Sequence, residues 1–194
     1  MNGNEILSVL RRVLTLDRDV FRQVRDDPGL TVPAVAGAGL AVLIGGIGAW
    51  LYGKTVWDGA AGFSFSDTII LGSIFAAILV LAGFGVTYVA LIQVLRVDIA
   101  PDALVRLLAA GFLPYAIGIL VCIPDLGFLF GMLSIIGVFW WTLFALRSAL
   151  PAANELRLAA AVASGMAVWI AIIPFISGSG NEFVTGVFVY GLIA

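Results

Sequence analysis

Four residues in apolar stretches of the chain carry groups that could bind a polar ligand: Arg106, Pro114, Tyr115 and Asp125. Ionisable groups inside apolar segments are functional candidates because a charge in hydrocarbon is costly without a partner. Pro114 removes the usual donor for the carbonyl of Ala110, so another polar group must approach that carbonyl. A buried Tyr115 needs a partner for its hydroxyl. These requirements predict polar contacts at a depth where the chain is otherwise apolar.

Asp125 lies in a turn, Ile123-Pro124-Asp125-Leu126-Gly127, that separates two apolar stretches. Its carboxylate is predicted to cap the following helix, a contribution of about 0.5–2 kcal/mol. Arg106 is roughly 28 Å away along one helix, so the two do not pair. Arg106 is instead predicted to snorkel to the membrane surface. We expect the hairpin from Pro114 to Asp125 to be either purely structural or a small outward-facing binding site.

The remaining composition excludes several kinds of chemistry. The sequence has no histidine and one cysteine, Cys122, which excludes a Cys/His zinc site, a disulfide within the chain and any triad with a histidine base. It has no GxSxG motif, and no pair of carboxylates lies within an apolar stretch. We therefore predict a protein that is not an enzyme and that uses neither a metal nor a cofactor.

The composition also decides the class of protein. Of the 194 residues, 62% are hydrophobic and 11% are charged, whereas a soluble domain has about 25% charged residues. The mean hydropathy is +1.13. So few charges cannot cover a soluble globule, and a basic face for nucleic acid is missing as well. The sequence predicts an integral membrane protein whose first partner is the lipid bilayer, with no nucleic-acid partner.

Uncharged stretches define the elements that must position these residues. A membrane-spanning helix needs about 20 mostly apolar residues. The predicted fold is an all-α polytopic bundle of five transmembrane helices. Residues 1–30 form a cytoplasmic amphipathic segment, and residues 31–194 form the transmembrane domain with a short outer tail after Glu182. The predicted spans are 32–52, 68–93, 105–123, 126–146 and 158–177.

The distribution of basic residues predicts the orientation. Nine of the ten lie before the first span, after the second and after the fourth, and only Lys54 lies on the other side. Because cytoplasmic loops are rich in Lys and Arg, the N-terminus is predicted in the cytoplasm and the C-terminus outside. Residues 1–30 contain no signal-peptide core. The bias toward Arg, Ala and Gly favours a bacterial source and the inner membrane.

The N-terminal segment predicts a surface helix over residues 4–25. Its apolar residues recur at spacings of three and four, and arginines fill the polar side. Such a helix lies in the headgroup plane as an anchor, or it is a docking surface for a cytosolic or membrane protein partner. Small residues at every fourth position of the first and fifth spans predict close helix contacts, within the bundle or in a homo-oligomer.

Three motifs in this order resemble the Yip1 domain family of small five-span membrane proteins. They are the segment 13–30 ending in Asp-Pro-Gly-Leu, the pair Phe112-Leu113-Pro114-Tyr115 and Ile123-Pro124-Asp125-Leu126-Gly127, and the helix Trp140–Leu150 with its Ala-Leu-Arg exit. Eukaryotic members bind Rab GTPases in vesicle traffic through a long cytosolic domain, which is reduced here to about 30 residues. The family has no catalytic residues to carry over.

The resemblance implies a non-enzymatic membrane scaffold or adaptor, in membrane organisation or trafficking-like partner binding. The alternative from the residues is a small transporter or channel, which is motivated by Pro114, Tyr115 and the kinks expected in the spans. A continuous polar cavity would favour transport, whereas a packed apolar interior would favour the scaffold.

Reporter fusions test the predicted topology. Alkaline phosphatase fused after Ala194 is expected to be active, because this enzyme requires export, and a fluorescent protein fused before Met1 is expected to fold in the cytoplasm. A C-terminal reporter that is active in the cytoplasm would overturn the five-span topology.

Overall fold

The computed structural model describes residues 3–55 and 65–177, and these residues contain helices and no strand, which confirms the all-α class. The predicted outer tail lies outside the described residues. The elements are α1 (Gly3–Leu14), α2 (Arg18–Asp26), the 3-10 turn η1 (Pro28–Leu30), α3 (Thr31–Thr55), the π-helix η2 (Ser66–Leu71), α4 (Gly72–Val89), the π-helix η3 (Ala90–Val94), α5 (Pro101–Gly111), the 3-10 helix η4 (Leu113–Cys122), α6 (Gly127–Ala149) and α7 (Glu155–Ser177).

Four helical stretches among the described residues are long and apolar enough to cross a membrane. They are Pro28–Thr55, Thr68–Val94, Pro101–Cys122 and Gly127–Ala149, and they coincide with the first four predicted spans. The fifth predicted span, 158–177, is helical within α7 but is not among these four. The fifth crossing therefore stays a prediction.

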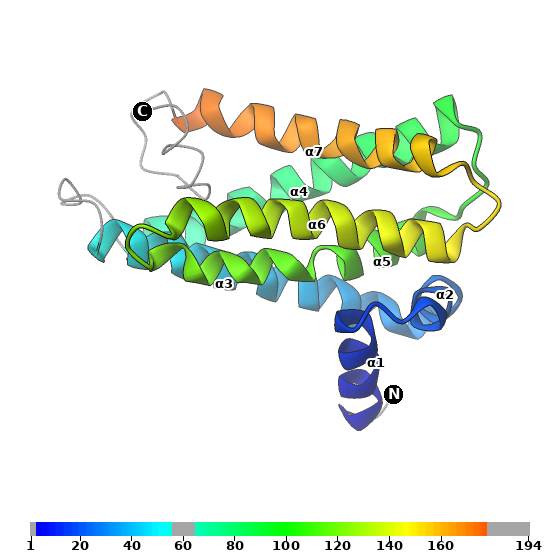
Figure 1. Ribbon diagram of the computed structural model, residues 1–194, viewed down its shortest axis with the longest axis horizontal. Coiled ribbons are helices and arrows are strands. Elements are labelled where there is room, and N and C mark those ends of the chain that lie inside the picture. The colour runs from blue at the N-terminus through cyan, green and yellow to red at the C-terminus, as the bar shows by residue number, and fades with distance from the viewer. Residues whose placement is uncertain (1–2, 56–64, 178–194) are drawn as a thin grey trace.

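The long helices lie along one axis and alternate in direction (Figure 1). The connections from α4 to α5 and from α6 to α7 lie at the same end of the bundle as α2, and the turn between η4 and α6 lies at the opposite end. Arg96 lies in the connection from α4 to α5, and Arg157 lies in the first turn of α7, next to the connection from α6. Lys54 lies in the last turn of α3, at the other end. The fold thus gathers the basic segments at the end of the bundle that carries α1 and α2. This end is called the head end, and α1 and α2 together are called the head.

The N-terminal segment is two helices, so the prediction of one helix over 4–25 was wrong. The chain turns at Leu16, whose φ of 55° is left-handed, and Asp17 then starts α2. The Asp17 carboxylate accepts a hydrogen bond from the backbone N–H of Asp19 at 2.9 Å. An aspartate that caps a new helix satisfies N–H groups that a continuous helix would have bonded internally, and this stabilises the break.

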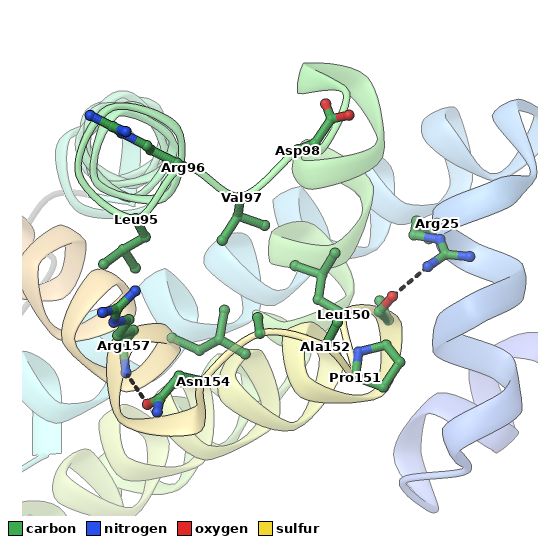
Figure 2. A pocket seen from close by; sticks show the side chains of 13 residues that line it. Arg25, Leu95, Arg96, Val97, Asp98, Leu150, Pro151, Ala152, Asn154 and Arg157 are labelled. Carbon is green, nitrogen blue, oxygen red and sulfur yellow. Dashed lines mark hydrogen bonds between the residues drawn. The ribbon is translucent and has the colours of Figure 1, made fainter.

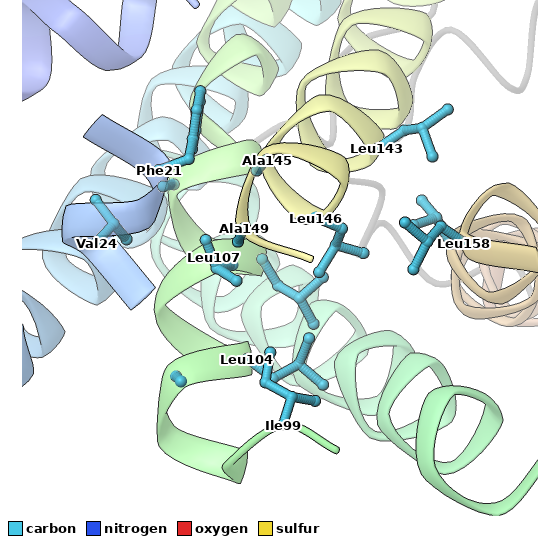
Figure 3. Close-up of a cluster of buried hydrophobic side chains, with 14 of the residues drawn as sticks. Phe21, Val24, Ile99, Leu104, Leu107, Leu143, Ala145, Leu146, Ala149 and Leu158 are labelled. Atoms are coloured by element: carbon cyan, nitrogen blue, oxygen red, sulfur yellow. The ribbon is translucent and has the colours of Figure 1, made fainter. Parts of the chain in front are cut away.

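The two N-terminal helices have different surroundings. Helix α2 packs on the bundle through Val20, Phe21 and Val24, which are all buried. Figure 3 shows Phe21 and Val24 beside the side chains of α5 and α6. Helix α1 stands across the bundle axis (Figure 1) and leaves Leu7 and Leu14 63% and 52% exposed. The docked helix therefore holds a second helix whose apolar face is partly uncovered.

Glycines allow the membrane helices to approach closely. The small-residue stripe of α3 packs within the chain, since a Cβ at Gly45 would lie 2.7 Å from the ring of Tyr115. A Cβ at Gly111 would lie 2.6 Å from Cα of Thr142 in α6. After Gly111, the third span changes from α-helix to the 3-10 helix η4 near Pro114, where a backbone donor is missing. The close contacts at Gly45 and Gly111 and the narrower 3-10 helix η4 together make the interior around Tyr115 dense.

A matched pair of glycines in the α4–α7 region tests this packing. The Gly165→Ala variant would place a methyl group 2.5 Å from the carbonyl oxygen of Gly83 and against the hydroxyl of Thr87. We expect it to lower the free energy of unfolding by about 1–3 kcal/mol. In the Gly85→Ala variant nothing lies within 4 Å of the new methyl group, so stability should be unchanged or slightly raised. Equal melting temperatures for the two variants in detergent would contradict the close α4–α7 contact.

Candidate functional site

The candidate site is built around Arg106 of α5, whose side chain is 3% exposed. Its Nε donates to the carbonyl of Val24 at 2.8 Å, and Nη2 donates to the carbonyl of Arg25 at 2.6 Å. Nη1 donates to the hydroxyl of Thr31 at 3.0 Å and to the carboxylate of Asp102 at 2.7 Å. One guanidinium therefore joins the end of α2, the start of α3 and the first turn of α5.

The prediction that Arg106 snorkels to the surface was wrong because the folded head supplies its partners. The last carbonyls of a helix have no donor within that helix, and a positive charge is favourable at this end. The C-terminal turn of α2 lies over Arg106. The carbonyls of Val24 and Arg25 therefore gain donors, and the buried guanidinium gains acceptors. Four N–H donations occupy most of the five that a guanidinium has, so Arg106 acts in this structure as a tie between elements.

Helix α2 in turn caps the end of α6. The Nε of Arg22 donates to the carbonyl of Ser148 at 3.3 Å, and Nη1 of Arg25 donates to the carbonyl of Ala149. The guanidinium of Arg25 also pairs with Asp26 at 2.6 Å and holds the pKa of that carboxyl below its usual value. Arginines of one helix thus donate to the unpaired C-terminal carbonyls of another helix. Helix α2 receives such a cap from Arg106 of α5 and supplies one to α6.

The end of α1 is held in a similar way. Trp141 of α6 donates its indole N–H to the carbonyl of Val13 at 3.3 Å. Across the turn, the Nε of Arg12 donates to Asp17 at 2.7 Å, and this hydrogen bond is the largest cause of the lowered pKa of Asp17. The orientation of α1 is therefore set by contacts to α6 and to the turn before α2.

Pro114 and Tyr115 are buried in a packed interior and do not line an outward-facing opening. The ring of Tyr115 lies 5.1 Å from that of Phe112 and 5.6 Å from that of Trp169. A Cβ at Gly137 of α6 would lie 2.9 Å from Cβ of Pro114. The adjoining cavity, which Phe112 and Trp169 also line, has a volume of about 30 Å³. This is room for about one water molecule.

The cap predicted for Asp125 was wrong. Helix α6 starts after Leu126 without a side-chain cap, and Asp125 is exposed with a φ of 63°. The turn is closed by the backbone, since the N–H of Leu126 donates to the carbonyl of Ile123 at 3.2 Å. Asp tolerates the left-handed conformation better than most residues, which accounts for its place here. The four predicted site residues do not meet: Arg106 lies toward the head, Pro114 and Tyr115 in the interior, and Asp125 in the far turn.

A cleft of about 520 Å³ opens at the head end of the bundle, between the 95–100 connection and the 150–154 connection (Figure 2). Its polar lining consists of Arg25, Arg96, Asp98, Asn154 and Arg157. In the sequence, Arg96 and Arg157 bear only on the predicted orientation of the chain. The signal that could have found the cleft was present, because the connections after the second and fourth spans must emerge at the same end.

No cluster of three His, Cys, Asp or Glu residues that could hold a metal ion occurs in the part of the chain that the structure describes. No family model, curated protein or solved structure matches the chain. The resemblance to the Yip1 domain family therefore stays a prediction.

Replacing Arg106 tests the tie between the head and the bundle. In the Arg106→Lys variant an ammonium cannot reach the carbonyls of Val24 and Arg25 together with Thr31 and Asp102. We expect the free energy of unfolding in detergent to fall by about 2–4 kcal/mol. Limited trypsin digestion should also cut faster within α2.

The matched control is Arg147→Lys. Arg147 pairs with Glu155 at 2.7 Å, but both side chains are more than half exposed, so the change should be below about 1 kcal/mol. Similar small losses in both variants would show that the buried contacts of Arg106 do not hold the head.

Proposed function

We propose that the protein is a non-enzymatic integral membrane scaffold or adaptor of the Yip1 type, acting in membrane organisation or trafficking-like partner binding. In this proposal the helical bundle holds α1 in a fixed orientation, and the apolar face of α1 binds a cytosolic or membrane protein partner. The observation that carries the proposal is the set of caps between helices at the head end, above all the four hydrogen bonds of Arg106.

Rigid attachment matters because binding costs less when a surface is already ordered. Val9 and Val13 of α1 are buried against the rest of the chain, while Leu7, Leu10 and Leu14 on the adjoining side are exposed. A helix with one apolar edge docked and the other open is suited to receive a partner helix or the membrane surface. The dense packing around Tyr115 also supports a scaffold over a transporter.

The proposed setting is the inner membrane of a bacterium, with α7 as the fifth span, the N-terminus in the cytoplasm and the C-terminus outside. Helix α1 lies across the bundle axis, so in this setting it runs along the cytoplasmic surface of the membrane (Figure 1). On α7, Ala163, Ala167 and Ala171 are exposed at a spacing of four. Such a stripe supports a homo-oligomer.

The alternative function, a small transporter or channel, is favoured by one observation at the other end of α3. Within the described residues, the indole nitrogen of Trp50 and the hydroxyl groups of Thr68 and Ser73 are buried without a hydrogen-bond partner. Thr68 belongs to the π-helix η2, and such irregular turns are frequent at functional sites. Solute or ion flux into proteoliposomes, lost in the Thr68→Val variant, would support this alternative over the scaffold.

Photo-crosslinking from α1 tests the adaptor proposal. A photoreactive residue at Leu7 should capture a defined protein partner in cells, whereas the same residue at Ser8, on the polar side of α1, should not. A second substitution on the apolar face, Leu14→Ser, is expected to reduce the Leu7 adduct at least about fivefold, because each buried leucine contributes about 1.5–3 kcal/mol. If the Leu7 probe labels only lipid, α1 is an anchor and the adaptor proposal is wrong.

A further inference from the structure

Two of the three arginines that line the cleft at the head end, Arg96 and Arg157, take part in no ion pair among the described residues. Arg12, Arg22, Arg25, Arg106 and Arg147 each form an ion pair with an acidic side chain. Arg96 and Arg157 form none with residues 3–55 and 65–177, and both are exposed at the cleft. Asp98 is the one acidic side chain among the described residues that line the cleft, against the arginines Arg25, Arg96 and Arg157, so the lining carries a net positive charge.

Arg96 also occupies a backbone position that favours glycine. Its φ is 52°, in the left-handed region. The N–H of Val97 donates to the carbonyl of Leu91 at 3.0 Å, and this bond closes the end of η3 around Arg96. Helices that end in this way usually have glycine at the left-handed residue. An arginine held there is strained, and strain of this kind is concentrated at functional sites.

The other groups of the cleft leave the charge of Arg96 and Arg157 available. Arg25 is compensated by Asp26. Figure 2 shows the side chains of Arg96 and Asp98 pointing apart, with Arg157 rising from α7 toward Leu95. Asn154 uses its Oδ1 to accept the backbone N–H groups of Leu156 and Arg157, so its amide NH₂ remains a donor at the rim.

The base of the cleft is apolar, through Leu95, Val97, Leu150 and Leu158. Its volume of about 520 Å³ lies within the range of small-molecule sites, roughly 300–1,000 Å³. A cavity with donors and positive charge at the rim and aliphatic side chains below fits a ligand that has both an anionic and an apolar part. The cleft also lies at the end of the bundle, where membrane helices meet the headgroup region.

We infer that this cleft binds a phosphate group, with Arg96 and Arg157 as the two cationic contacts. Guanidinium groups match phosphate oxygens in geometry, and a phosphate offers oxygens to two walls of a cleft at once. The phosphate of an anionic phospholipid and a free phosphate share this chemistry, and the apolar base favours the lipid. The site is independent of the proposed adaptor function, because it uses no residue of α1.

The experiment compares three variants of the full chain, purified in detergent and freed of lipid: Arg96→Gly, Arg157→Gln and the control Arg11→Gln. Arg11 is exposed on α1 outside the cleft, so its replacement removes the same charge without changing the site. Native mass spectrometry measures retention of phosphatidic acid, with phosphatidylcholine as the comparison lipid. In a second arm, sodium phosphate is titrated and the melting temperature is followed.

The wild type should retain one phosphatidic acid, and Arg96→Gly and Arg157→Gln should each weaken its binding about tenfold or more, whereas Arg11→Gln should not. Arg96→Gly should keep or raise the melting temperature, because glycine relieves the left-handed residue. Stabilisation by sodium phosphate as well would show that the phosphate group alone is sufficient, and its absence would assign the site to a lipid headgroup. Equal effects of all three variants, or unchanged binding in Arg96→Gly and Arg157→Gln, would overturn the phosphate site.

Discussion

The unsatisfied carbonyl groups at helix ends constrain the head end of this protein. Helices α1, α2 and α6 all end there, and the last turn of each leaves carbonyls without a donor inside the helix. Few polar groups are available in a chain with 11% charged residues. Trp141 donates a hydrogen bond to a carbonyl at the end of α1, and Arg106 donates to two carbonyls at the end of α2. Arg22 and Arg25 donate to carbonyls at the end of α6. Each helix end is thus held by a side chain from another helix.

These caps link elements that are far apart in the sequence. Arg106 bonds residues about 80 positions earlier, and the arginines of α2 reach carbonyls more than 120 positions later. Because a charged donor to a buried carbonyl costs more to remove than an exposed ion pair, the head behaves as part of the bundle. The orientation of α1 follows from this docking.

The interior of the bundle depends on a different constraint, which is close backbone approach. Lipid and leucine are equally apolar, so helices in a membrane associate through small residues and good packing. The ring of Tyr115 packs against Gly45, and Gly83 and Thr87 pack against Gly165. The result is a dense middle with room for about one water beside Trp169, while the larger cavity lies at the end of the bundle. This division places the polar chemistry of the described residues at the head end and in the unpaired groups near Thr68.

The sequence by itself determined the helical class, the approximate positions of four helices long and apolar enough to cross a membrane, and the segregation of basic residues to one end, because hydropathy and charge act on each segment separately. It did not determine the break at Leu16, since the apolar period continues through it. Nor did it determine the roles of Arg106 and Asp125. An arginine near a helix end snorkels or becomes buried according to which carbonyls the fold brings over it, and the turn at Asp125 closes through backbone contacts. The cleft between Arg96 and Arg157 was decided only by the tertiary structure, because the order of the spans places the two connections at the same end of the bundle but does not place them side by side.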